Sequence, residues 1–146
     1  MATIYFDMDG TIADLYSVDG WLDSLIAEDT KPYADAEPMV NCAEFCKCAS
    51  ALIALGYTLG VISWGSKNGS KDYTKRVKRT KVEWLRKHFG DVFSEIHVVK
   101  YGTPKYSVAK DKSGILFDDE EQNRVAWQGQ AYTHDELMDK LREMCG

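Results

Sequence analysis

The stretch Thr3-Ile4-Tyr5-Phe6-Asp7-Met8-Asp9-Gly10-Thr11 decides the fold, because it joins an apolar run to a pair of carboxylates. The run is short and rich in β-forming residues, which predicts a buried strand. Open α/β sheets bind ligands in the loops at the carboxyl ends of their parallel strands. The stretch therefore predicts an acidic site at one edge of such a sheet, although Asp-x-Asp-Gly is also common turn chemistry.

Three more segments supply polar groups to the same predicted edge. They are Ser63 after the run 57–62, Lys105 in Thr103-Pro104-Lys105, and Asp118-Asp119 after the run 114–117. Each has an ordinary explanation as well: a lone serine, a solvated lysine with Lys100 and Lys110 as competitors, and an acidic helix cap. Parallel strands end at a common edge, so the four segments in this order favour a single site.

These residue types suit phosphoryl transfer, which needs an in-line nucleophile, a cation and donors that hold the equatorial oxygens. Asp7 is the candidate nucleophile that forms an acyl-phosphate, and Asp9 is the candidate acid and base. Closely packed carboxylates repel one another unless a cation lies among them, and Mg²⁺ prefers carboxylate oxygens together with substrate phosphate. The predicted metal ligands are Asp7, Asp9, Asp118 and Asp119, and the choice of direct ligand between the last two stays open.

The other residues of these segments are predicted to hold the phosphate. Gly10 lets the backbone approach closely. Thr11 and Ser63 offer hydroxyl donors, and Lys105 supplies a point cation. Trp64 stands beside Ser63 and is assigned to the same phosphate-binding group.

The four segments resemble the motifs of the haloacid dehalogenase (HAD) superfamily of aspartate-nucleophile phosphatases. The matches are Asp7 and Asp9 to the first motif, Ser63 to the second, Lys105 to the third, and Asp118-Asp119 to the fourth. The resemblance spans nearly the whole chain. It implies an α/β fold with a three-layer, Rossmann-like parallel sheet and helices on both faces. It also implies Mg²⁺ as cofactor and a phosphate monoester as substrate.

A narrower resemblance rests on the stretch 81–90 (Lys-Val-Glu-Trp-Leu-Arg-Lys-His-Phe-Gly) followed by the runs 96–99 and 115–119. This order is similar to that of the 5′(3′)-deoxyribonucleotidases and their bacterial and viral relatives. The resemblance implies a nucleoside monophosphate, or a similar small phosphate ester, as substrate.

The segment 14–37 falls where the superfamily inserts a small helical cap over the active site. The insert is short, with room for one helix and a loop, whereas larger nucleotidases of this type have a fuller cap. Tyr16, Trp21 and Tyr33, together with Trp64, are candidates to stack on a base or to close the pocket against water. Alternatively, Trp21 only packs the cap helix onto the body.

Charge gives a second indication of substrate. The net charge of −5 disfavours general nucleic-acid binding, yet nine of the eighteen Lys and Arg residues lie between Lys67 and Lys87. The inward stripe of the predicted helix 72–89 is read as Tyr73, Val77, Trp84 and His88. Most of the cations are then expected on a solvated face. Alternatively they form a basic shoulder that draws in a polyanion, with Lys67 and Lys71 nearest the site.

Three rival functions stay open, one of which is transfer of the phosphoryl group to an acceptor other than water. The basic shoulder favours removal of a 3′-phosphate from nucleic acid ends. Outside enzymology, the alternative is a protein that binds a phosphorylated ligand without turning it over.

Length and periodicity predict one domain over residues 1–146, with strands and helices alternating. The predicted strands are Thr3–Phe6, 57–62, 96–99 and 114–117, and the predicted helices are 18–27, 39–55, 72–89, one from 103–104 and one from a capping box at Thr133. The four cysteines are expected to be reduced and buried. With no apolar run that could cross a bilayer and no signal before the first strand, a cytoplasmic protein is expected. The sequence does not predict its oligomeric state.

Overall fold

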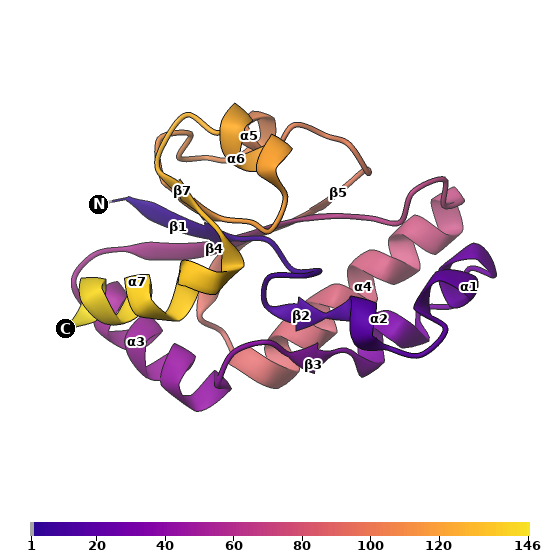
Figure 1. Cartoon of the computed structure of the whole chain (residues 1–146), viewed down its shortest axis with the longest axis horizontal. Coiled ribbons are helices and arrows are strands. Elements are labelled where there is room, and N and C mark those ends of the chain that lie inside the picture. The colour runs from indigo at the N-terminus through magenta and orange to yellow at the C-terminus, as the bar shows by residue number, and fades with distance from the viewer. Residues whose placement is uncertain (1) are drawn as a thin grey trace.

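The computed structural model describes residues 2–146, and its centre is a five-stranded sheet in the order β5-β4-β1-β6-β7 (Figure 1). Every neighbouring pair of strands in this sheet is parallel. The strands are β1 (Thr3–Phe6), β4 (Thr58–Trp64), β5 (Phe93–Val99), β6 (Ile115–Phe117) and β7 (Ala131–Tyr132). Since parallel neighbours require crossover connections, the helices fall between the strands, as predicted.

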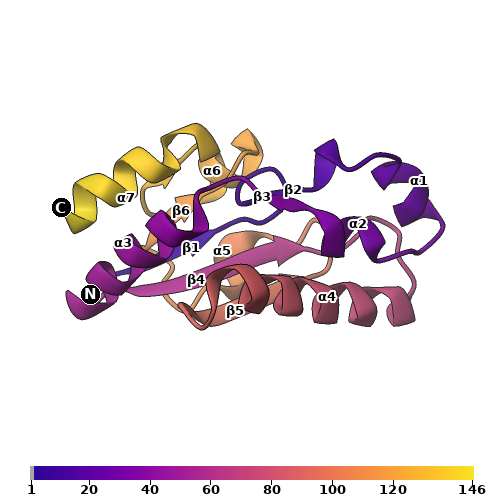
Figure 2. The same cartoon turned by 90° about the horizontal axis from the view of Figure 1, so that it is seen from below.

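Helices cover both faces of the sheet, which makes three layers (Figures 1 and 2). One face carries α3 (Cys42–Ala54), α4 (Lys71–Phe89) and α7 (Leu137–Cys145), and the other carries the short helices α5 (Lys105–Val108) and α6 (Glu121–Ala126). The alternation of side chains along β1 separates the two layers. Ile4 and Phe6 belong to the larger core beneath α3, α4 and α7, while Tyr5 belongs to the smaller core on the opposite face.

The larger core is built on aromatic contacts between the sheet and the helices. The ring of Phe6 lies 5.2 Å from that of Phe45, which in turn lies 4.9 Å from Phe89. Both pairs are edge-to-face, the geometry that aromatic quadrupoles prefer. On the other face the Tyr5 ring meets Trp127 edge-on at 5.5 Å. These contacts fix β1 at the centre of the molecule.

Side-chain caps set the starts of the long helices. The Asn41 side chain accepts a hydrogen bond from the backbone of Glu44 at the start of α3, and Ser70 does the same for Tyr73 in α4. The predicted capping box at Thr133 is present, and it opens a 3₁₀ turn, η2 (His134–Glu136), that leads into α7. The sequence thus predicted this helix start correctly.

The chain between β1 and α3 forms a small separate unit, which we call the α1–α2 segment (residues 13–38). It contains β2 (Ala13–Asp14), η1 (Leu15–Ser17), α1 (Trp21–Ile26), α2 (Lys31–Asp35) and β3 (Glu37–Pro38), with β2 and β3 antiparallel. Leu15 and Tyr33 pack against Tyr73 and Val77 of α4 in a third small core. In Figure 1, α1 and α2 lie at the end of the molecule opposite the two termini.

The structure also adds elements that the sequence patterns missed. None of the predicted helices covers residues 31–38, but α2 begins there with Pro32 in its first turn, where proline leaves no hydrogen bond unmade. Strand β7 and helix α6 are too short for a periodic signal.

In residues 2–146, no helix combines the length and apolar character needed to span a membrane. The four cysteines are free thiols, of which Cys48 is buried and the others are half-buried.

Candidate active site

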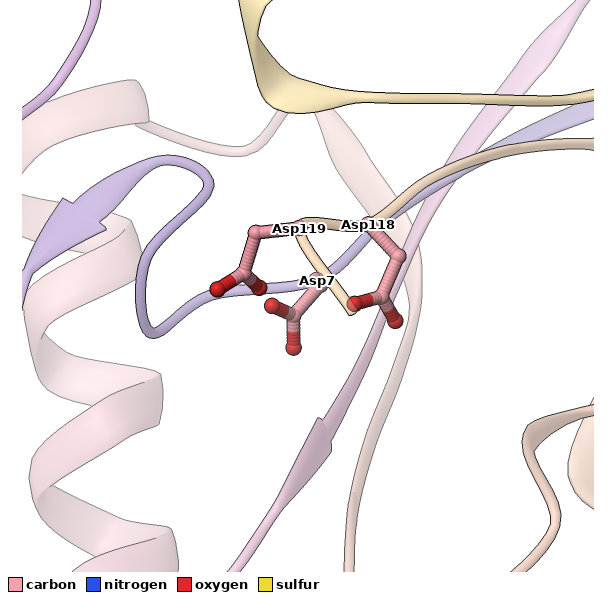
Figure 3. A group of neighbouring side chains, drawn as sticks. All are labelled: Asp7, Asp118 and Asp119. Carbon is pink, nitrogen blue, oxygen red and sulfur yellow. The ribbon is translucent and has the colours of Figure 1, made fainter. Parts of the chain in front are cut away.

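Three strand ends place the predicted polar segments side by side. Asp7 directly follows β1, Ser63 lies near the end of β4, and Asp118 and Asp119 directly follow β6. Because β1 pairs with both β4 and β6, these ends meet at one edge of the sheet. Figure 3 shows the carboxylates of Asp7, Asp118 and Asp119 gathered there, and one oxygen from each lies within 4.8 Å of the others.

Lys105 joins two of these carboxylates. Its buried Nζ donates to Asp7 Oδ1 and to Asp118 Oδ2, each at 2.7 Å. Burial alone would lower the pKa of Lys105, but the two carboxylates reverse the effect and raise it above its usual value. The ammonium is therefore charged, and it fixes the orientation of the Asp7 carboxylate.

The turn after β1 holds the second oxygen of Asp7. The Met8 carbonyl accepts hydrogen bonds from the backbone N–H groups of the three residues 11–13. This turn places the Thr11 hydroxyl 3.1 Å from Asp7 Oδ2, to which it donates, and 3.2 Å from the Asp119 N–H, from which it accepts. The predicted phosphate donor Thr11 thus links Asp7 to Asp119 in this structure.

Gly10 sets how closely the turn approaches Asp119, and its role in the approach to phosphate stays a prediction. Its φ is +85°, a conformation that favours glycine, and a Cβ atom there would collide with the Asp119 carboxylate. Only glycine allows Asp119 to lie this close to the turn. Gly10 therefore sets the spacing between the first and fourth segments.

Asp9 is held by Lys81, a residue that sequence reasoning missed. Lys81 Nζ is fully buried and donates to Asp9 Oδ2 at 2.9 Å, to Ser63 Oγ at 2.7 Å and to the Trp64 carbonyl at 2.7 Å. Three acceptors satisfy all the protons of the ammonium, which is how a protein tolerates a buried charge. The bond to Ser63 Oγ also leaves the serine proton free to donate.

Lys81 is therefore an exception to the expectation that most of the cations of α4 lie on a solvated face. Its position follows Tyr73 and Val77 at the same four-residue spacing, and Leu85 continues the stripe. Periodicity indicated this position, but the charge of lysine argued against it. His88, expected on the inward stripe, is only half-buried and lies beside Trp84.

Burial and mutual repulsion raise the pKa values of the acidic cluster. Burial raises the pKa of Asp118 to about 6, with the charge of Asp7 adding to the shift. Burial, a hydrogen bond with Asp7 and the charge of Asp7 raise the pKa of Asp119 to about 8. Burial also raises the pKa of Asp9, although Lys81 acts in the opposite direction. Oxygen donors that repel one another in this way suit a hard divalent cation.

Asp118 and Asp119 differ in how many donors they already have. Asp118 Oδ2 accepts from Asn123 at 3.1 Å in addition to Lys105, and its Oδ1 accepts from the Glu120 N–H at 2.9 Å. Asp119 Oδ1 accepts a long bond of 3.4 Å from Thr11. Asp119 is thus the freer of the two carboxylates. No sequence motif indicated Asn123.

A cavity of about 280 Å³ opens above these groups, with a polar floor and an apolar wall. The floor includes Asp7, Asp9, Lys105 and Asp118, and the wall includes Leu15, Tyr16, Trp21, Leu22, Leu25, Ile26 and Tyr33. The Trp21 ring lies 5.0 Å from the Tyr16 ring and also packs against the third core, and its role toward a substrate stays a prediction. Sequence reasoning missed the aliphatic members of this wall.

Trp64 and Lys67 also line the cavity. The Trp64 indole N–H donates to the Thr103 carbonyl at 2.8 Å, so this group is engaged and the ring serves as a wall. Lys105 Nζ lies 5.5 Å from the centre of that ring, within cation–π range. Lys67 is exposed at the rim.

No protein-family model and no curated protein matches this chain. Among solved structures, the chain is similar to the D,D-heptose 1,7-bisphosphate phosphatase from Burkholderia thailandensis, with a TM-score of 0.60. The two sequences are 12% identical, and the similarity covers 98% of this chain and 97% of the other. At this identity the likeness concerns architecture alone. It confirms the predicted Rossmann-like α/β fold with a parallel sheet.

Proposed function

We propose that this protein is a Mg²⁺-dependent phosphomonoesterase of the HAD superfamily. The observation that carries the proposal is the constraint on its two leading carboxylates. Asp7 is held at one oxygen by Lys105 and at the other by Thr11, while Asp9 is held by Lys81. An oriented nucleophile beside an oriented acid is what phosphoryl transfer requires. The structurally similar protein named as a phosphatase supports this chemistry.

The metal-binding group fits Mg²⁺ by the chemistry of its donors. Asp7, Asp118 and Asp119 each offer a carboxylate oxygen within the mutual 4.8 Å limit. We assign Asp119 as the better direct ligand, because both Asp118 oxygens already accept hydrogen bonds. When bound, Mg²⁺ neutralises charge on the transferring phosphoryl group. The Asp9 carboxylate, also predicted as a metal ligand, pairs with Lys81 at 2.9 Å.

The protein groups account for both halves of the reaction. An Asp7 carboxylate oxygen attacks phosphorus, the bond from phosphorus to the ester oxygen breaks, and that oxygen takes the proton of Asp9. The raised pKa of Asp9 favours the protonated form that this step needs. Asp9, now ionised, takes a proton from water, which attacks phosphorus and releases phosphate from Asp7. Ser63 and Lys105 steady the phosphoryl oxygens throughout.

A nucleoside 5′-monophosphate is the substrate class that we propose for this site. Its phosphate suits the polar floor, and its base suits a wall that contains Tyr16 and Trp21. Removal of a 3′-phosphate from a nucleic acid end is the second candidate. Two exposed lysines favour it: Lys67 in the loop before α4, and Lys71 at the first position of that helix.

Phosphate release from a panel of esters tests the proposal. The panel contains nucleoside 5′- and 3′-monophosphates, sugar phosphates and a 3′-phosphorylated oligonucleotide, each with Mg²⁺ and with chelator. Asp7→Asn is the test variant, and Asp91→Asn, an exposed aspartate outside the site, is its control. The proposal is supported if phosphate release depends on Mg²⁺, is abolished by Asp7→Asn and persists in Asp91→Asn. Tight ligand binding without release from any ester would refute it in favour of a binding protein.

A further inference from the structure

A second cavity lies next to the active site, and its lining is strongly cationic. Its volume is about 850 Å³, within the range of ligand-binding sites. It is lined by Gly65, Ser66, Lys67, Asn68, Gly69, Lys71, Thr74, Lys75, Lys100 and Tyr101. Four of these residues are lysines, and the lining, drawn from residues 2–146, contains no carboxylate. In a protein of net charge −5, this local excess of positive charge points to an anionic ligand.

The two cavities adjoin each other. Gly65, Ser66, Lys67 and Tyr101 line both of them. Cations and aromatic rings alternate from the first cavity to this shared lining. Lys105 lies over the Trp64 ring, that ring lies 5.0 Å from Tyr101, and Lys67 lies 5.8 Å from the centre of the Tyr101 ring. A substrate held at Asp7 can therefore extend along rings toward the lysines.

We propose that this cationic groove is a subsite for a second phosphate group of the substrate, an inference that rests on the phosphatase function proposed above. The preferred substrate class is then an organic phosphate ester with a further phosphate at the far end of the molecule. Lysine ammonium groups bind phosphate as point charges and need no fixed geometry. Exposed, solvated lysines suit a group that must also leave after each turnover.

The start of α4 adds to the positive potential of the groove. Lys71 opens this 19-residue helix, whose first N–H groups carry the positive end of the helix dipole. Two carboxylates lie near this helix start: Asp72 is paired with Arg76 at 2.9 Å, and Glu28 accepts hydrogen bonds from the N–H of Ser70 at 2.9 Å and from its hydroxyl at 2.7 Å. Neither carboxylate lines the groove, so the four lysines have no acidic partner in its lining.

Two kinds of molecule offer a second phosphate: a small bisphosphate, such as a nucleoside 3′,5′-bisphosphate, and a nucleic acid strand, whose next phosphodiester would occupy the groove. Salt distinguishes them. A strand that contacts several lysines releases several counterions, so its binding weakens steeply with salt concentration, whereas a bisphosphate responds less. Both sources use the same subsite.

The test compares kcat/KM for a nucleoside 3′,5′-bisphosphate and for its two monophosphates. The wild-type protein is expected to prefer the bisphosphate by about tenfold, the effect of a few screened ion pairs. The groove variant is Lys71→Gln/Lys75→Gln/Lys100→Gln. The control variant is Lys78→Gln/Arg79→Gln/Lys87→Gln, which removes three exposed cations of α4 outside the groove. The preference is expected to disappear in the groove variant and to persist in the control.

A binding measurement keeps the inference separate from the proposed activity. Calorimetry on the Asp7→Asn variant gives the affinities for the bisphosphate, the monophosphates and a 3′-phosphorylated dinucleotide without turnover. Tighter binding of either two-phosphate ligand that is lost on adding the groove substitutions supports the subsite, even if no ester is hydrolysed. Equal affinities for all ligands, or equal losses in the groove and control variants, overturn it. Release from monophosphates without any bisphosphate preference would leave the phosphatase function standing and refute the subsite alone.

Discussion

Replacement of the buried Lys81 by methionine tests the central electrostatic feature of this site. Methionine keeps the length of the side chain and its helix propensity, so the change removes little besides the charge and its three hydrogen bonds. The loss leaves the Asp9 carboxylate, which is 17% exposed, without a cation. Ser63 Oγ and the Trp64 carbonyl lose a donor at the same time.

The expected loss of unfolding free energy follows from the charge that is left unpaired. Removing one partner of a buried ion pair destabilises a protein by about 3–5 kcal/mol, because the other charge is left unpaired. Asp9 keeps some contact with water, so we expect the low end, about 3 kcal/mol. In a chain of this size that loss corresponds to a fall in melting temperature of about 10 °C. Asp9→Asn leaves the Lys81 ammonium without its carboxylate partner and is expected to lower the free energy of unfolding by a similar amount.

A double-mutant cycle separates this pair from ordinary packing. The Lys81→Met/Asp9→Asn protein contains neither charge, so its loss of unfolding free energy is expected to be well below the sum of the two single losses. The control is Lys78→Met, one turn earlier on the exposed face of α4, with an expected change within about 0.5 kcal/mol. Chemical denaturation of all four variants gives these values. Additive losses, or a Lys81→Met protein as stable as the control, would refute the reasoning.

Three further predictions concern the metal, the turn and the apolar wall. Mg²⁺ is expected to raise the melting temperature more at about pH 9 than at about pH 6, because Asp119, with its pKa raised to about 8, must lose a proton to bind metal. Without metal, the raised pKa of Asp119 gives a contribution to the stability of the fold that is present at low pH and is lost as the pH rises through about 8. Thermal melts with and without chelator check both statements. Gly10→Ala is expected to lower the free energy of unfolding by about 1–3 kcal/mol and to abolish the Mg²⁺-induced rise in melting temperature. The control is Gly20→Ala, also at positive φ but with open space around it, which is expected to retain that rise. Equal Mg²⁺ responses of the two variants would contradict the proposed collision with Asp119. Leu22→Ser is expected to raise KM for nucleotide esters about fivefold, while Leu55→Ser, at the same 54% exposure but outside the cavity, leaves KM unchanged in steady-state kinetics.

The parts of the site that follow strands could be predicted from the sequence, because buried parallel strands have a plain signal. Apolar runs in front of Asp7, Ser63 and Asp118 placed all three at strand ends, and the structure brings them together. Parallel pairing of the strands is then enough to bring these residues to the same edge of the sheet, whatever the sequences of the connecting loops. The sequence order of the segments carried this information.

The parts that helices contribute could not be predicted in the same way. Lys81 occupies an inward position on α4, but a lysine there contradicts the usual rule for cores, and only the acceptors on two other elements justify it. Asn123 lies on the six-residue helix α6, too short for a periodic pattern. Helix α2 was hidden by Pro32, which marks a helix start as readily as a break. Each omission concerns a residue whose environment comes from distant parts of the chain.

The net charge of the inner site predicts that Mg²⁺ binds before phosphate. Its members are the carboxylates of Asp7, Asp9, Asp118 and Asp119 and the ammonium groups of Lys81 and Lys105. With all four carboxylates ionised, which requires Asp9 and Asp119 to lose their protons, four negative and two positive groups leave a formal charge of −2. This charge opposes a dianionic phosphate and matches one divalent cation. Inorganic phosphate is therefore expected to protect the protein against thermal unfolding only in the presence of Mg²⁺. Equal protection in chelator would mean that the two lysines suffice for the phosphate, and that the metal enters after the substrate rather than before it.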